Sequence, residues 1–431
     1  MKTAIAATRD SWYVIQPLVN CTTFIQEPTN ESSLTCDRIL GNIVNVLLPL
    51  FQPIDFKSRL YSICDVVRSL IYASSNSTSI TQTCNTLDKN PSRRDVQYHI
   101  SELNIFWVEL VVNRILQTMV NKTAVLQQQQ SQALNIAIDL TEIPYYGEPK
   151  NKGEVRHGMA KSGTTHFFAY ASAYVILYGR RFTIAVKYVR AEELLVDVVR
   201  YLLPEIFRMN IRIKCLFLDK GFFTASVINY LKSKRIRFII AAFPRGRKSG
   251  GLWELAKRRS SFITSYMMTD SKTGEESRFK LYTVVKYRKK RYKKKCGRQY
   301  MFYATTNLVN VPTERMFEEY CKRFGIESSY KIMKKSRAIT SSKSAVLRFL
   351  YILISFVIQN EWIYDKWSYL SKITAGSKYG RKYDIQFTYF FMLQFIRLAL
   401  EKMYGIINSI PINNNRYIVV TGGCCSDSGY Q

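Results

Sequence analysis

Histidine is scarce in this chain of 431 residues, and its nine cysteines follow no regular spacing. The three histidines, His99, His157 and His166, lie too far apart for an H-E-x-x-H zinc helix. No two cysteines form a C-x-x-C pair, which argues against a structural zinc site and against a disulfide framework. We therefore expect no histidine-rich metal site and a reducing, intracellular compartment.

The sequence also lacks internal repeats of 20 to 50 residues, which argues against solenoids and propellers. The first residues do not resemble a signal peptide, because Arg9 and Asp10 interrupt them before an apolar stretch accumulates. One apolar run, 345–363, has the length of a membrane span. Arg348 interrupts this run and Glu361 falls near its end, so we predict a buried core helix and no membrane partner.

Acidic residues are half as common as basic ones. The chain has 32 Asp and Glu against 63 Lys and Arg, which gives a net charge of +31 and a pI near 9.8. Such a surface suits a polyanion such as DNA, RNA or an anionic membrane. Hydrophobic residues make up 47% and charged residues 22%, as in ordinary folded proteins, and the length predicts two or three domains.

The first 130 residues predict an all-α region. Apolar residues recur at helical spacing in three segments, 34–50, 56–72 and 105–120. Between them, two short helical patterns, 79–87 and 92–103, are joined by a polar turn, as in a helix-turn-helix that binds a DNA major groove. The outer face of the second pattern carries Arg93, Arg94, Gln97 and His99. An ordinary helical hairpin with a basic face is the alternative.

After this region the periodicity changes to that of strands. The predicted strands are 135–139, 167–178, 181–189, 213–218 and 237–243. The predicted helices are 191–203, which Pro204 would stop, 223–234, and a late helix over 313–335. The order β-β-β-α-β-α-β followed by a helix is that of a ribonuclease H-like domain, an α/β fold with a mixed five-stranded sheet. Residues 245–300 would form a β-rich insertion.

These patterns predict five segments along the chain. They are a helical N-terminal region (1–130), the first part of the catalytic domain (131–244), the insertion (245–300), the second part of the catalytic domain (301–370), and a C-terminal helix and tail (371–431).

Three carboxylates fall where such a fold would bring them together. Asp139 closes the first strand, Asp219 closes the fourth, and Glu327 lies on the late helix. Close carboxylates repel one another, and divalent cations relieve that repulsion. Oxygen ligands suit Mg²⁺ or Mn²⁺, and two such ions about 4 Å apart can drive phosphoryl transfer. Glu142, three residues past Asp139, is a rival for the same role.

The late helix contains Tyr320, Arg323, Glu327 and Lys334 at fixed spacing. This pattern resembles the Y-(2)-R-(3)-E-(6)-K signature of DDE insertion-sequence transposases of the cut-and-paste type. The segments 218–223 (LDKGFF) and 138–141 (IDLT) are similar to that family's second and first motifs. The resemblance covers about residues 135–345.

The resemblance implies three catalytic metal ligands, Asp139, Asp219 and Glu327, with two Mg²⁺ or Mn²⁺ ions. Spacing by three, four and seven residues places the signature residues on one helical face. Arg323 and Lys334 would then hold phosphates, and Tyr320 would contact the DNA end.

A basic run over 286–298 predicts a further contact with DNA phosphates. It includes Lys289, Lys290, Arg291, Lys293 and Lys294. A solvated hairpin tip is the alternative for this run.

Together these features predict a DNA transposase that cleaves the ends of a mobile element and transfers a 3′-hydroxyl to target DNA. It would act as a homodimer on DNA in the cytoplasm, associated with the nucleoid. A catalytically inactive DNA-binding remnant and a ribonuclease H-like nuclease are the alternatives. The presence of all three carboxylates argues against the remnant, and the Tyr-Arg-Glu-Lys spacing argues against the nuclease.

Overall fold

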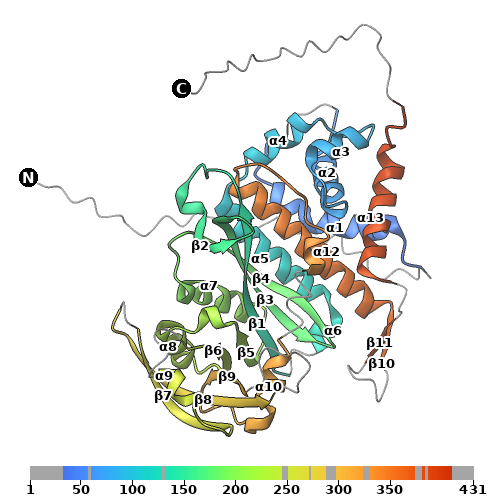
Figure 1. The fold of residues 1–431 in the computed structure, drawn as a ribbon. Helices are drawn as coiled ribbons and strands as arrows, with labels where there is room; N and C mark the ends of the chain where they lie inside the picture. The colour runs from blue at the N-terminus through green and yellow to red at the C-terminus, as the bar shows by residue number, and fades with distance from the viewer. Residues whose placement is uncertain are drawn as a thin grey trace, which may run out of the picture. The chain divides into compact units, whose positions relative to one another are not determined.

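A large mixed β-sheet organises the chain in the computed structural model (Figure 1). The structure describes residues 33–56, 60–128, 132–244, 251–270, 273–287, 298–323, 331–373, 381–383 and 387–409. The described residues from Cys36 onward form one compact unit.

Five strands of this sheet form the ribonuclease H-like core. They are β1 (Leu134–Tyr145), β3 (Thr164–Leu177), β4 (Arg180–Val189), β5 (Ile213–Leu218) and β6 (Phe238–Ala242). Their spatial order is β4-β3-β1-β5-β6, with β3 antiparallel to β1 and β4, and β5 parallel to β1 and β6. Long apolar and β-branched runs form these strands because both faces of the sheet are covered. The predicted fold class is confirmed.

The hairpin between β3 and β4 turns at Tyr178 and Gly179. Both residues have positive φ angles, 48° and 69°, which is the backbone of a two-residue type I′ turn. Glycine adopts this conformation without strain, so this turn fixes the register of the two strands.

The first strand is longer than predicted, and the strand that follows it was missed. β1 passes through Asp139 and continues to Tyr145, because β3 goes on pairing with it after β5 has ended at Leu218. Asp139 therefore does not close the strand; it follows the last residue of β1 that pairs with β5. The missed strand, β2 (Arg156–Lys161), pairs with the start of β3. It is almost entirely exposed and lacks the apolar alternation that reveals a strand.

Helices α7 (Leu195–Arg208) and α8 (Ala225–Ser233) connect the parallel strands. The prediction that Pro204 stops the first of them is wrong, because α7 continues through Pro204 to Arg208. Proline removes one helical hydrogen bond. Six apolar side chains of α7, among them Leu203 and Ile206 on either side of this position, are buried. Their burial outweighs the lost bond.

The predicted β-rich insertion forms strands that extend the central sheet. They are β7 (Phe262–Thr269), β8 (Glu276–Tyr287) and β9 (Arg298–Thr305), and a short helix, α9 (Gly251–Leu255), precedes them. The three strands pair antiparallel, and β9 also pairs with β6. The insertion is therefore continuous with the central sheet through its backbone hydrogen bonds.

The N-terminal part of the described chain is helical, as predicted. Its helices are α1 (Cys36–Leu47), the 3₁₀ turn η2 (Leu48–Phe51), α2 (Ile63–Ser75), α3 (Ile80–Thr86), α4 (Arg93–Ser101), α5 (Ile105–Lys122) and α6 (Ala124–Gln128). Helices α2 and α4 both begin with a capping box, in which Ser62 bonds with Asp65 and Ser92 with Asp95. The Ser92–Asp95 capping box accounts for the start of α4, the second of the two short helices that the sequence predicts.

The apolar run predicted as a core helix is α12 (Ala345–Ser368). It is long and apolar enough to cross a membrane, but 89% of its apolar window is buried inside the protein. Helices α4 and α5, taken together, pass the same test of length and composition, although a bend of 92° separates them. Helix α12 packs against α1, α2, α5 and β4 (Figure 1). The remaining elements are η3 (Lys152–Glu154), η4 (Lys220–Phe222), α10 (Thr313–Cys321), β10 (Ser371–Ile373), β11 (Arg381–Tyr383) and α13 (Tyr389–Tyr404).

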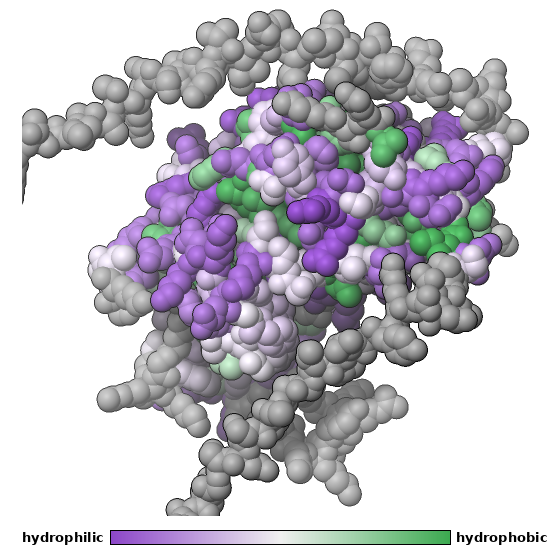
Figure 2. Space-filling view, turned by 90° about the horizontal axis from the view of Figure 1, so that it is seen from above, coloured by the Kyte–Doolittle hydropathy of each residue, from purple (hydrophilic) through white to green (hydrophobic). Residues whose placement is uncertain are grey.

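Helix α13 packs on α1 and α2. Its outer side exposes Phe390, Phe391, Leu398 and Met403. Apolar patches of this kind interrupt the hydrophilic surface in the view from above (Figure 2).

Side chains from α5 and α12 complete the outer edge of β4. Asn360 accepts from the backbone N–H of Thr183 at 2.9 Å and donates to its carbonyl at 2.8 Å. Asn113 makes the same pair of bonds to Val186, at 2.9 and 3.0 Å. Glu109 accepts from the N–H of Tyr188 at 3.0 Å. These side chains take the place of a neighbouring strand and satisfy backbone groups that would otherwise be buried without partners.

Candidate active site

Two of the predicted carboxylates lie side by side at the carboxyl end of β5. Ile138 of β1 pairs with Leu218 of β5, so the residues that follow, Asp139 and Asp219, are neighbours across the parallel ladder. The Asp139 side chain is 14% exposed and the Asp219 side chain is 38% exposed. The sheet register thus brings together two residues that are 80 positions apart in the sequence.

The guanidinium of Arg323 bridges these two aspartates. Its Nη2 lies 3.2 Å from Oδ1 of Asp139, and its Nη1 lies 3.3 Å from Oδ1 of Asp219. Nη1 also donates to the hydroxyl of Tyr320 at 3.1 Å, and that hydroxyl donates to the carbonyl of Leu218 at 3.1 Å. Tyr320 therefore ties the arginine to the strand that ends in Asp219.

Burial dominates the electrostatics of Asp139. The pKa of its carboxyl is raised to about 6, chiefly by removal from water and in smaller part by the nearby charge of Asp219. Arg323 opposes this rise, as does the backbone N–H of Leu140, which donates to Oδ1 at 2.9 Å. The ion pair at 3.2 Å does not bring this pKa back to its ordinary range, because the effect of burial is larger. Burial also raises the pKa of the Tyr320 phenol, which stays neutral.

The late helix differs from its prediction. α10 ends at Cys321, and Lys322 and Arg323 form a turn. Tyr320, Arg323 and Lys334 therefore do not lie on one continuous helix. Arg323 was expected to hold a phosphate, but in this structure it is paired with the aspartates.

Several predicted site residues lie apart from this centre or outside the described residues. Glu327 falls within 324–330, which the structure does not describe, and so do the basic residues Lys289, Lys290, Arg291, Lys293 and Lys294 within 288–297. Lys334 is described and exposed. The predicted role of each remains a prediction.

Glu142 does not join the two aspartates. Side chains alternate along a strand, so residues 139 and 142 of β1 project from opposite faces of the sheet. The carboxylate of Glu142 instead pairs with Lys161 at 2.6 Å. Lys161 belongs to β2, which sequence reasoning missed. The dipeptide Ser162–Gly163, with φ angles of 52° and 81°, is a hairpin turn signal that would have revealed this strand.

The predicted pair of short helices is present as α3 and α4, and Arg93 and Arg94 are exposed on α4. His99, which was expected on the outer face, is 5% exposed. Its ring lies 4.3 Å from that of Phe56, centroid to centroid. The prediction for His99 is wrong because it occupies the apolar side of this short helix, next to the buried Ile100.

The two aspartates fit a bound cation. Each points one oxygen at the same positive group, the guanidinium of Arg323, so a cation is already accommodated between them. Two oxygen ligands are too few to hold a metal ion tightly, and within the described ranges no group of three or more metal-ligating side chains occurs. A hard divalent ion would therefore use Asp139, Asp219 and at least one further oxygen ligand.

Comparisons with known proteins identify the family of this chain. The family model described as "Transposase DDE domain" matches residues 130–358, more than half of the chain. Among solved structures the chain is similar to a piggyBac transposase synaptic complex with hairpin DNA, solved by cryo-EM. The TM-score is 0.47 at 12% sequence identity, with 86% of this chain and 80% of that chain covered. No curated protein matches the chain. The chain belongs to the Transposase DDE domain family.

Proposed function

We propose that this transposase-family protein is a catalytically active DNA transposase, which cleaves DNA at the ends of a mobile element and joins the freed 3′-hydroxyl to target DNA. The carrying observation is the pair Asp139 and Asp219, which share one cation at the carboxyl end of β5. A net charge of +31 supports a phosphate-rich partner.

Each residue of the centre has a proposed role. Asp139 and Asp219, with Glu327 as the third ligand, would hold two Mg²⁺ or Mn²⁺ ions, which activate the attacking oxygen and stabilise the leaving oxygen when bound. Arg323 would then leave the aspartates and pair with the DNA phosphate, since guanidinium binds phosphate as well as carboxylate. Tyr320 would keep this arginine at the centre through the bond that it accepts at 3.1 Å.

Other residues would hold the DNA outside the centre. Lys334, the exposed Arg93 and Arg94 of α4, and the basic run over 286–298 would contact backbone phosphates. Coordinated cutting of two ends would need two subunits, so the active form would be a homodimer on DNA. The protein would act inside the cell, at the nucleoid.

Labelled DNA from the regions that flank the gene provides the test. Wild type should cut one discrete position on each flank in Mg²⁺ or Mn²⁺ and none in chelator. Asp219→Asn should abolish cutting, whereas Glu142→Gln, which removes a carboxylate from the opposite face, should cut at the wild-type rate. Cutting at scattered sites would instead identify a nuclease. Binding without cutting in any metal would identify an inactive remnant.

A further inference from the structure

A positively charged surface lies at the start of β5, at the opposite end of this strand from Asp139 and Asp219. Six exposed cations gather there, and we call them the distal basic patch. They are Arg208, Arg212, Lys214, Lys234, Arg235 and Arg237.

The fold places these cations together. Arg208 ends α7, and Arg212 immediately precedes β5, where its carbonyl accepts from the N–H of Leu134 in β1 at 2.7 Å. Arg237 immediately precedes β6, and its carbonyl accepts from the N–H of Leu216 in β5 at 2.8 Å. The starts of two adjacent parallel strands and the loops that lead into them therefore carry the whole patch.

Acidic partners hardly compensate this charge. Glu205 pairs with Arg208. Across the described ranges, no carboxylate lies within 4 Å of the other five cations. Like charges gathered at one edge repel one another and destabilise the fold slightly, and a polyanion relieves that repulsion.

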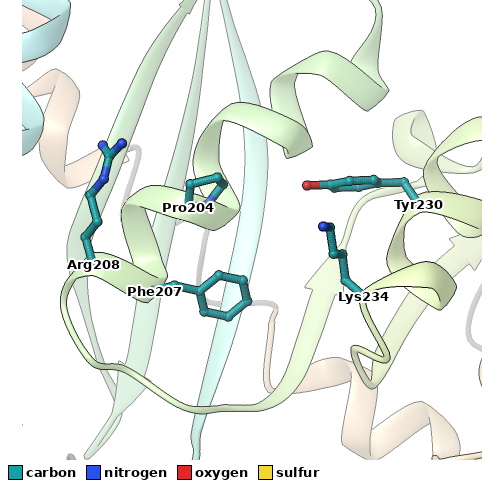
Figure 3. Close-up of a pocket in the computed structure, with 5 residues that line it drawn as sticks. All are labelled: Pro204, Phe207, Arg208, Tyr230 and Lys234. Atoms are coloured by element: carbon teal, nitrogen blue, oxygen red, sulfur yellow. The ribbon is translucent and has the colours of Figure 1, made fainter.

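Aromatic side chains form a shallow pocket within the patch. Tyr230 of α8 and Lys234, which directly follows that helix, project toward Pro204 and Phe207 of α7, and Arg208 lines the same pocket (Figure 3). The Phe207 side chain is 47% exposed. The Lys234 ammonium lies 5.9 Å from the centroid of the Tyr230 ring. Cations beside exposed rings suit a nucleic acid backbone, whose phosphates and sugars present charged and apolar groups in turn.

The position of the patch determines which DNA it can reach. Residues 213–218 separate Arg212 from Asp219, so roughly 20 Å of strand lies between the patch and the catalytic centre. A duplex cut at Asp139 and Asp219 approaches the other edge of the sheet. The patch lies at the opposite end of the strand, where a separate duplex could bind without displacing the one that is cut.

We propose that the distal basic patch binds the backbone of a second DNA duplex, separate from the one that is being cut. This inference rests on the proposed function, because it assumes that the centre at Asp139 and Asp219 acts on DNA. The patch binds phosphates, so its affinity is independent of sequence and weakens with salt.

The test removes two charges from the patch and two from elsewhere. The patch variant is Arg235→Gln/Arg237→Gln. The matched control is Lys89→Gln/Lys402→Gln, which removes two exposed cations from the helical layer. Each protein is saturated with a short labelled end duplex in Ca²⁺, and binding of an unrelated duplex with a different label is measured over a salt series. Cleavage of the short end duplex is measured separately in Mg²⁺.

The patch variant should cut the short end duplex at the wild-type rate and bind the second duplex on the order of tenfold more weakly. The slope of log affinity against log salt should fall by about 0.9 for each phosphate that the variant no longer neutralises. The control should match wild type.

Equal binding of the second duplex by both variants would refute the inference, and so would a parallel loss of end cleavage, which would place the patch on the cut duplex. If wild type cuts nothing, the proposed function fails instead. Binding of the unrelated duplex alone still tests the patch in that case.

Discussion

Arg323 holds two negative charges with one positive group, so it balances the two aspartates only in part. The guanidinium lies 3.2 and 3.3 Å from the two aspartates, and Asp139 is nearly buried. Burial, together with the neighbouring charge of Asp219, raises its pKa to about 6. A divalent cation would supply the missing charge and release the arginine. The stability of the metal-free protein and its response to metal should therefore both depend on Arg323.

Replacing Arg323 with alanine should destabilise the metal-free protein by about 2 kcal/mol. The two aspartates would then face each other with no cation between them, and Asp219 is open enough to water to moderate the loss. Mn²⁺ should raise the melting temperature of the variant more than that of wild type, because it no longer competes with a guanidinium. Lys322→Ala removes a neighbouring cation that pairs with Glu319, and serves as the control. Equal shifts by Mn²⁺ in wild type and Arg323→Ala would contradict this role.

Asp139 should also give the stability a specific pH dependence. Its pKa is about 6 in the folded protein and 3.8 in a free side chain, so the folded state resists its ionisation. The resulting penalty is absent below pH 4, grows between pH 4 and 6, and is complete above pH 6. Asp139→Asn should therefore be as stable as wild type near pH 4 and more stable by about 3 kcal/mol at pH 7.5. Urea denaturation in chelator across this pH range measures the difference. Mn²⁺ should reduce this difference in stability, because it stabilises wild type alone.

At the scale of single elements, β4 depends on two asparagines from outside the sheet. Asn360→Leu would leave the N–H and carbonyl of Thr183 buried without partners. Each such group costs about 1 to 3 kcal/mol, so we expect a loss of about 2 to 4 kcal/mol in urea denaturation. Asn121→Ala, at an exposed position on α5, should change the stability by less than about 0.5 kcal/mol. A loss for Asn360→Leu as small as for this control would show that water replaces the asparagine.

The strands were predictable wherever burial on both faces leaves an apolar run, as in β3, β4 and β5. The end of β1 was not, because residues 140–145 mix polar and apolar side chains and pair only with β3. Pro204 was misread because a local rule for helix breaking competes with burial that depends on the tertiary structure. The sequence also did not predict that β9 extends the central sheet. Its pairing with β6 joins strands about 60 residues apart, and no local pattern encodes such a pairing.

The candidate site, too, was predictable where local sequence decides it and not where tertiary contacts do. Asp139 and Asp219 could be predicted as neighbours because each follows a short apolar run, and the ends of parallel strands meet at one edge of a sheet. The pairing of Arg323 with both aspartates could not be predicted. Spacing along a continuous helix placed it on one face with the other signature residues, where it was expected to hold a phosphate, whereas the turn after Cys321 points it at the aspartates.

At the scale of the whole molecule, α12 joins parts that the sequence divides into separate segments. It packs against β4 of the catalytic sheet and against α1, α2 and α5 of the helical region. Helix α13 returns to the same layer, where Tyr404 bonds to Asp65 and Tyr72 to Glu401. The helical region and the catalytic sheet therefore share one core.

This shared core predicts that the catalytic segment does not fold alone. A fragment of residues 131–370 would lose α5, which covers β4, and would expose the faces of α12 that α1, α2 and α5 bury. Burial of α12 stabilises only when those partners are present, so the fragment should be insoluble or lack a cooperative thermal transition. Co-expression of residues 33–128 should restore part of its solubility. A soluble fragment with a sharp transition would show instead that residues 131–370 form an independent domain and that α12 tolerates an exposed apolar face.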